Sequence, residues 1–272
     1  MSNMHKLQHS LRYMPALLLV ATITLNIMWP LTQGHARSVV TICGVLTFFV
    51  ESKIHSFISR GLKYTTTFIL IVLPLAFLVE VIGTHTGFPF GDYTYSHRLG
   101  IMLFSVPLLI PLAWFMMMYP SLLIAQSLTT VRWKQVGIAA WLMATWDLFL
   151  DPQMVNEGYW TWHDSMNNPT TVIPWTNFVG WFVVSVIIFA LLVFVLPNAK
   201  AEESAAQPQS SNTVPYLAVM WVWLGSFIAN VFTYSPFLNQ PRVAITGLVG
   251  MGIVLAPWSV RELRTLRARP VH

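Results

Sequence analysis

Two carboxylates in this sequence lie inside long apolar runs, where charged side chains are rare. Glu80 lies in the run that ends near Gly83, and Asp147 lies in the run that ends near Asp151. A carboxylate in apolar surroundings is costly unless it is paired or faces a polar cavity, so both residues are candidates for function. Asp151 follows Asp147 by four positions, which places the two on one face of a helix. Since burial favours the neutral form of a carboxyl group, these residues are candidate proton donors.

An aromatic-Thr-aromatic triplet follows each of the two carboxylates at the same spacing. Tyr93-Thr94-Tyr95 follows Glu80, and Trp160-Thr161-Trp162 follows Asp147. The alternation is typical of a short strand or an extended loop. Aromatic faces attract cations, including a carbocation formed when an alkene takes up a proton. The buried carboxylates and the aromatic rings together favour proton-initiated chemistry on an apolar substrate. The alternative interpretation is that the rings form an aromatic belt at the membrane surface.

The two carboxylate-triplet stretches align with each other without a gap. A shift of 67 positions (147 − 80) places Gly91 on Gly158, Pro107 on Pro174 and Trp114 on Trp181. This alignment predicts an internal two-helix repeat, about 70–130 and 137–197, although two hairpins of similar composition could agree by chance. Two consecutive helices return the chain to the same side, so the copies are predicted to be parallel, with both carboxylates facing one leaflet.

The composition indicates a polytopic all-α membrane protein with one membrane domain over residues 1–272. The chain is 55% hydrophobic and 9% charged, whereas soluble domains carry about 25% charged residues. Apolar runs of the length that crosses a bilayer, about 17–25 residues, recur along the chain. About eight spans are predicted, at 14–32, 38–57, 65–83, 101–127, 135–151, 174–196, 214–233 and 241–258.

The distribution of charge predicts the orientation of these spans in the cell membrane. Of the 15 Lys and Arg residues, only Arg37, Arg98 and Arg242 fall in segments on the predicted outer side. Cytoplasmic loops are enriched in Lys and Arg, so both termini are predicted to be cytoplasmic and the carboxylates to face the outer leaflet. The net charge of +5 is therefore explained by the orientation of the protein in the membrane and does not indicate nucleic-acid binding. Glu51 is predicted to be solvated at the cytoplasmic edge.

Residues 197–213 form a polar, low-complexity segment between the sixth and seventh spans. The segment has little apolar surface to bury, so it is predicted to be a disordered cytoplasmic linker.

The sequence has no motif for a redox cofactor or a metal. It lacks a Gly-rich dinucleotide loop and a phosphate-binding loop, its histidines are dispersed, and Cys43 is its one cysteine. The sequence therefore predicts neither a cofactor nor a metal site.

The chain also resembles a known family over residues 65–195. The motifs in the first half are Glu80, Gly87, Phe90-Gly91, Tyr93, Tyr95, Leu99-Gly100, Val106-Pro107 and Pro111-Leu112-Ala113-Trp114. Those in the second half are Trp146-Asp147-Leu148, Asp151-Pro152, Met154, Gly158, Trp160, Trp162, Pro174, Asn177 and Gly180-Trp181. Together they resemble the CruF-type carotenoid 1,2-hydratases, which include bisanhydrobacterioruberin hydratases and γ-carotene 1′-hydroxylases.

The resemblance implies addition of water, without a cofactor, to the terminal 1,2 double bond of an acyclic carotenoid ψ-end group, giving a tertiary alcohol. The implied substrate is a carotenoid of the lycopene, γ-carotene or bisanhydrobacterioruberin type, taken from membrane lipid. Other enzymes of carotenoid synthesis are candidate partners.

Roles for individual residues follow from this chemistry as predictions. Asp147 or Glu80 is predicted to be the acid, and Asp151 or the other carboxylate is predicted to orient water. The predicted substrate-contacting residues are Tyr93, Tyr95, Trp114, Trp146, Trp160, Trp162, Asn177 and Trp181. A membrane carotenoid cyclase is an alternative, because it would protonate the same end group and then close a ring. A proton-coupled transporter or lipid-binding scaffold that uses the carboxylates is a second alternative.

Overall fold

The computed structural model describes residues 11–164, 166, 168–170, 172–196, 212–232 and 240–267. Its helices are α2 (Met14–Met28), η1 (Trp29–Leu31), α3 (Gly34–Thr86), η2 (His97–Leu99), α4 (Leu109–Leu128), α5 (Arg132–Asn156), α6 (Trp175–Val195), α8 (Thr213–Phe232) and α9 (Pro241–Arg267). This architecture confirms the predicted all-α polytopic membrane protein. The linker predicted at 197–213 lies outside the described residues, except for its last two, and Thr213 begins α8.

Helix α3 contains two of the predicted spans. It runs for 53 residues, but Gly61 has φ 81° and ψ 174°, which interrupts the helical backbone between the two spans. Glycine adopts this conformation without the steric cost that a Cβ would bring. Six of the described helices are long and apolar enough to cross a membrane, and α5, which carries Asp147 and Asp151, is not among them. The described helices overlap all eight predicted ranges, while the number of spans stays a prediction.

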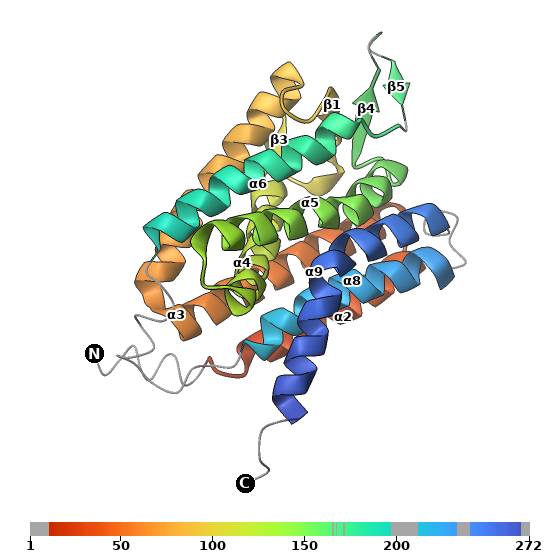
Figure 1. Cartoon of the computed structure of the whole chain (residues 1–272). Helices are drawn as coiled ribbons and strands as arrows, with labels where there is room; N and C mark the ends of the chain where they lie inside the picture. Colours follow the sequence, from red (N-terminus) through yellow and green to blue (C-terminus); the bar gives the residue numbers. More distant parts are fainter. Residues whose placement is uncertain are drawn as a thin grey trace.

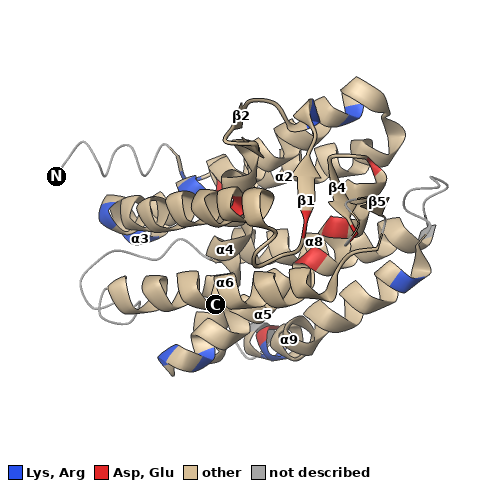
Figure 2. Cartoon of the chain, turned by 90° about the horizontal axis from the view of Figure 1, so that it is seen from above, with Lys and Arg blue, Asp and Glu red and all other residues tan. Residues whose placement is uncertain are grey.

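The helices pack in neighbouring pairs around α4 and α5. Helix α3 packs against α4, α5 packs against α6, and α4 also packs against α5. Helices α2, α8 and α9 lie together on one side of this core (Figure 1). Helix α4 forms the centre, because residues 114–125 are all buried. Figure 2 shows most of the basic residues toward the ends of helices, with acidic residues in the interior beside β1 and β4.

A small sheet closes one end of the helix bundle. Strand β1 (Tyr93–Tyr95) pairs antiparallel with β4 (Trp160–His163), and β5 (Pro169–Thr170) pairs with β4. The register places Tyr93 opposite Trp162, Thr94 opposite Thr161, and Tyr95 opposite Trp160. The predicted extended conformation of both triplets is therefore confirmed. Because strand side chains alternate between faces, the four rings lie on one face and the two threonines on the other.

The β1–β4 register is centred on the Thr94–Thr161 pair. A two-fold axis that relates the copies would exchange each residue with the one 67 positions away. It would therefore turn the Tyr93–Trp162 pair into the Tyr95–Trp160 pair and would pass between Thr94 and Thr161. The register agrees with the proposed repeat, and the duplication itself stays a prediction.

The chain between β1 and α4 forms a second short hairpin. Strands β2 (Met102–Leu103) and β3 (Val106–Pro107) pair antiparallel, and α4 begins two residues after Pro107. At the turn, Phe104 and Ser105 have positive φ, and the Phe104 side chain is exposed.

The prediction for Glu51 is wrong, because its side chain is fully buried. Ser52 Oγ lies 3.1 Å from Glu51 Oε2 and 3.2 Å from the carbonyl oxygen of Met116 in α4. The packing of α4 against this part of α3 removes Glu51 from solvent. One turn further along α3, His55 Nδ1 and the Tyr119 hydroxyl form a 2.8 Å hydrogen bond.

Candidate active site

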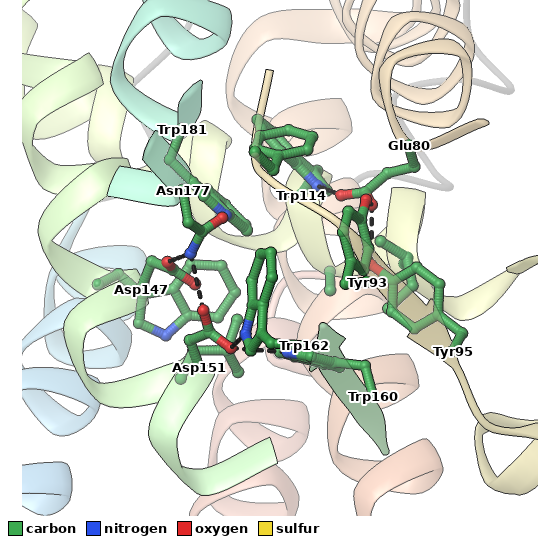
Figure 3. Close-up of a pocket in the computed structure, with 15 residues that line it drawn as sticks. Glu80, Tyr93, Tyr95, Trp114, Asp147, Asp151, Trp160, Trp162, Asn177 and Trp181 are labelled. Carbon is green, nitrogen blue, oxygen red and sulfur yellow. Dashed lines mark hydrogen bonds between the residues drawn. The ribbon is translucent and has the colours of Figure 1, made fainter. Parts of the chain in front are cut away.

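All eleven residues predicted for the site line a single cavity of about 40 Å³ between α3, α4, α5, α6 and the β1–β4 sheet (Figure 3). They are Glu80, Tyr93, Tyr95, Trp114, Trp146, Asp147, Asp151, Trp160, Trp162, Asn177 and Trp181. The structure adds four apolar residues, Phe90, Ile110, Ala113 and Leu150. Phe90 and Ala113 belong to the family motifs but were given no role, whereas Ile110 and Leu150 are apolar side chains within apolar runs and carry no signal of their own.

Glu80 accepts three hydrogen bonds inside the cavity. Its Oε2 accepts from the hydroxyls of Tyr93 at 2.6 Å and Tyr95 at 2.8 Å, and its Oε1 accepts from Trp114 Nε1 at 3.0 Å. Burial, followed by the nearby Glu80 carboxylate, raises the pKa of both tyrosine hydroxyls, which therefore remain protonated donors. Donors aimed at a carboxylate stabilise its charged form.

The two aspartates on α5 meet at the amide of Asn177 on α6. Asn177 Nδ2 lies 2.7 Å from Asp147 Oδ2 and 2.7 Å from Asp151 Oδ2. Asp151 Oδ1 also accepts from Trp160 Nε1 at 2.6 Å and Trp162 Nε1 at 3.1 Å. The shared helix face predicted for the aspartates is confirmed, because α5 extends to Asn156.

The donors do not follow the two-fold relation between the copies. Asp147 corresponds to Glu80 by position, yet the triplet that corresponds to the tyrosines donates to Asp151, one helical turn further on. A tyrosine hydroxyl is at the tip of its ring, whereas the indole N–H lies on the ring edge, nearer the backbone. The tyrosines therefore reach a deeper carboxylate than the tryptophans do. Within the described ranges Asp147 is left with one amide donor, which it shares with Asp151.

The cavity brings three carboxyl groups together without a basic residue in its lining. Both ion pairs in the described ranges belong to a fourth acidic residue, Glu157, which contacts Arg37 and Arg98. Arg98 Nη2 lies 3.6 Å from Glu157 Oε2, so Arg98 is committed to Glu157 rather than to the cavity. Like charges in a low-dielectric site repel strongly, so the three groups cannot all be ionised cheaply.

Aromatic rings form most of the remaining wall. Trp114 and Trp181, which correspond in the two copies, stack with centroids 4.2 Å apart and planes 4° apart. Trp146 meets Trp181 edge-on at 6.0 Å. In the sheet, Tyr93 contacts Trp162 at 5.0 Å and Tyr95 contacts Trp160 at 5.7 Å. The cavity therefore offers ring faces on several sides, which suits a transient cation.

Two glycines let β1 and the loop before it approach the helices. A Cβ on Gly83 would lie 2.7 Å from the Tyr93 hydroxyl oxygen, and a Cβ on Gly180 would lie 2.8 Å from the Phe90 ring. Contacts this short require something to move. The absent side chains therefore allow Tyr93 to reach Glu80 and Phe90 to close the cavity.

Comparison with known proteins agrees with the resemblance in the motifs. The family described as "Carotenoid biosynthesis protein" matches residues 15–254. Bisanhydrobacterioruberin hydratase of Haloarcula japonica is 26% identical over 195 residues, which are 68% of this chain and 61% of that relative. The alignment thus spans less than two thirds of the relative's length. No solved structure matches the chain. Because the family match extends over most of its length, this chain belongs to the carotenoid biosynthesis protein family.

Proposed function

We propose that this protein hydrates the terminal 1,2 double bond of an acyclic carotenoid ψ-end group, giving a tertiary alcohol. The observation that carries the proposal is the combination of three buried carboxyl groups and aromatic rings around one small cavity. The hydratase name of the relative from Haloarcula japonica supports it.

Asp147 is the proton donor in this proposal. Glu80 and Asp151 each accept three hydrogen bonds, which stabilise their charged forms. Among the described residues Asp147 has a single donor, Asn177 Nδ2, and that donor is shared with Asp151. Of the three carboxyls, Asp147 therefore gains least from ionisation and is best suited to hold the proton between turnovers. Two like groups whose environments differ in this way form an acid and its charged partner.

Proton transfer goes from Asp147 to carbon 2 of the end group and leaves a tertiary cation at carbon 1. The stacked Trp114–Trp181 pair and the rings of the sheet surround the cavity in which this cation forms. The charged Glu80, held by its three donors, supplies a fixed negative charge across the cavity from Asp147 (Figure 3). General acid catalysis contributes about 10²–10⁴-fold, so charge and ring faces must stabilise the cation further.

Water then adds to carbon 1, and one of its protons returns to the Asp147–Asp151 pair. A cavity of about 40 Å³ has room for a water molecule beside the aspartates, since one needs roughly 10–15 Å³ by this measure. Asn177 donates through Nδ2 to both aspartates, which leaves its Oδ1 to accept a hydrogen bond from the attacking water. One proton leaves the enzyme and one is restored, so no cofactor is consumed.

The product and the source of its oxygen test the proposal in a host that makes an acyclic carotenoid. Cells with this chain are expected to yield a pigment heavier by one water molecule. The new oxygen should come from isotopically labelled water, with a normal yield in the absence of O₂. A product of unchanged mass with a closed ring would indicate a cyclase. Unaltered pigment, with substrate flux that follows the proton gradient, would indicate a transporter.

The ring of Trp181 gives a test of cation stabilisation that does not disturb the carboxylates. No described residue accepts a hydrogen bond from its indole N–H, so Trp181→Phe removes little except ring area. Trp181→Leu should lower the hydration rate by about 30-fold, since a desolvated cation–π contact is worth roughly 2 kcal/mol. Phe should retain most of the activity, as measured from product per unit of membrane protein. Equal rates for the two variants would contradict the role of the ring.

We infer from the charge distribution that both termini are cytoplasmic and that the cavity faces the outer leaflet. Reporter fusions after Thr130, between α4 and α5, should report the cytoplasm. Fusions after Met166, beyond the β1–β4 sheet, should report the outer side. Both sites on one side of the membrane would refute the inferred orientation.

A further inference from the structure

A second cavity of about 180 Å³ lies directly behind the candidate active site. Trp146 and Leu150, on one face of α5, belong to the lining of both cavities. The rest of the second lining comes mainly from α2, the first half of α3 and α8. The two cavities are therefore consecutive spaces with a common wall of two side chains.

The second cavity is largely apolar and has no charged residue in its lining. Aromatic and aliphatic groups predominate, among them Trp29, Phe48, Trp221 and Val222. The hydroxyls of Thr22 and Thr41, which also line the cavity, each donate to a helix carbonyl one turn back. Their hydrogen-bonding capacity is thus met largely within the protein. The side chains of Asn26, Gln153 and Ser226 add a polar minority to the otherwise apolar lining. The chemistry of the lining favours an uncharged, mainly hydrocarbon occupant.

The space is large enough for a rigid hydrocarbon group. An apolar protein cavity of about 150 Å³ is known to take up benzene. Gly44 on α3 lines this space without a side chain of its own. A Cβ added there would meet one atom within 4 Å, Asn26 Oδ1 at 3.8 Å, so the volume beside Gly44 is unfilled. Longer side chains at this position would enter the cavity.

We propose that the second cavity binds the polyene segment that adjoins the reacting end group of the substrate. This inference rests on the proposed function. An end group placed between Asp147 and the ring wall must continue as a linear, apolar chain. The neighbouring space across Trp146 and Leu150 is apolar, uncharged and of suitable size. Because the polyene is continuous with the end group, the Trp146 and Leu150 side chains must move apart for the chain to pass, and their position determines how far it enters the site.

Two cavity-filling substitutions on different helices test this inference. Gly44→Leu fills the space from α3, and Ser226→Leu fills it from α8. Gly137→Leu on α5 is the matched control, because a Cβ there meets nothing within 4 Å and Gly137 lines neither cavity. Each variant is produced in a host that makes lycopene. Hydrated product is measured by mass spectrometry, and the polyene that co-purifies with the membrane-extracted protein is measured by its visible absorption.

Both cavity-filling variants should lose about tenfold or more of the bound polyene and of the hydrated product, at normal protein level. The Gly137→Leu control should match the wild type. Wild-type levels of bound polyene in both cavity-filling variants would overturn the inference and leave the hydratase proposal standing. The cavity-filling variants could lose bound polyene while the wild type makes no hydrated product. That result would support polyene binding in the second cavity and overturn the proposed function. A wild type that neither binds nor hydrates the polyene would overturn both, and a lipid chain would then be the occupant.

Discussion

Replacement of Asp147 by Asn is expected to lower the yield of hydrated carotenoid by about 10²–10⁴-fold, the range that general acid catalysis supplies. The amide preserves the shape of the side chain and can still accept the hydrogen bond from Asn177 Nδ2. It has no acidic proton to transfer to the alkene. Product per unit of membrane protein, measured by mass spectrometry, gives the result.

Asp92→Asn is the matched control for Asp147→Asn. Asp92 directly precedes β1 and is exposed, and only its backbone carbonyl makes a described hydrogen bond, accepting from His163 N. The control should hydrate at the wild-type rate. Near-normal hydration by Asp147→Asn would exclude Asp147 as the acid and would make Glu80 or Asp151 the candidate donor.

Glu80→Gln is expected to lower the hydration rate by about 10²–10³-fold, the cost typical of losing one preorganised electrostatic contact to a developing charge. A glutamine can accept from Trp114 Nε1 and donate to the tyrosine hydroxyls, which can rotate to accept. The hydrogen-bonded frame should therefore survive while the negative charge is lost. Rates at equal protein level provide the measurement.

Glu51→Gln and a double variant complete the experiment on Glu80. Glu51 is also a buried carboxyl of α3 but lies outside the cavity lining, so Glu51→Gln should retain activity. The Glu80→Gln/Asp147→Asn double variant should be little worse than Asp147→Asn alone, because members of one catalytic unit are strongly non-additive. A drop in protein abundance with unchanged specific activity in Glu80→Gln would identify Glu80 as structural.

Much of the site could be predicted from the sequence, because its polar members interrupt apolar runs. Glu80 and Asp147 are conspicuous for this reason, the two aromatic triplets repeat their spacing, and Asn177 belongs to the motifs of the family resemblance. The partners of each carboxylate could not be predicted, since they depend on where a tyrosine hydroxyl and an indole N–H end in space. That difference gives Asp151, rather than Asp147, the donors of the second triplet.

The fold was predictable to a similar extent, and for a similar reason. Apolar length located the helical segments, the alternation in the two triplets indicated their extended backbone, and Pro174 marked the start of the sixth predicted span, where it is the N-cap of α6. The pairing of the triplets into a sheet was not predicted. Burial of Glu51 was not predictable, because it results from the packing of α4 against α3 rather than from its neighbours in sequence. The second cavity depends on side chains from several helices, and no local pattern in the sequence indicates it.

The β1–β4 ladder limits which changes in chain length the protein can accept. Side chains in a strand alternate, so a slip of one residue moves every ring to the opposite face. A single insertion between Asp92 and Tyr95 would turn tyrosine hydroxyls away from Glu80 and bring Thr94 into the cavity. The same slip would disturb the pairing that holds Trp160 and Trp162 against Asp151. Insertions and deletions should therefore be confined to the loops outside the two triplets, while substitutions of the triplet rings must preserve a donor with the same reach, a hydroxyl toward Glu80 and an indole N–H toward Asp151.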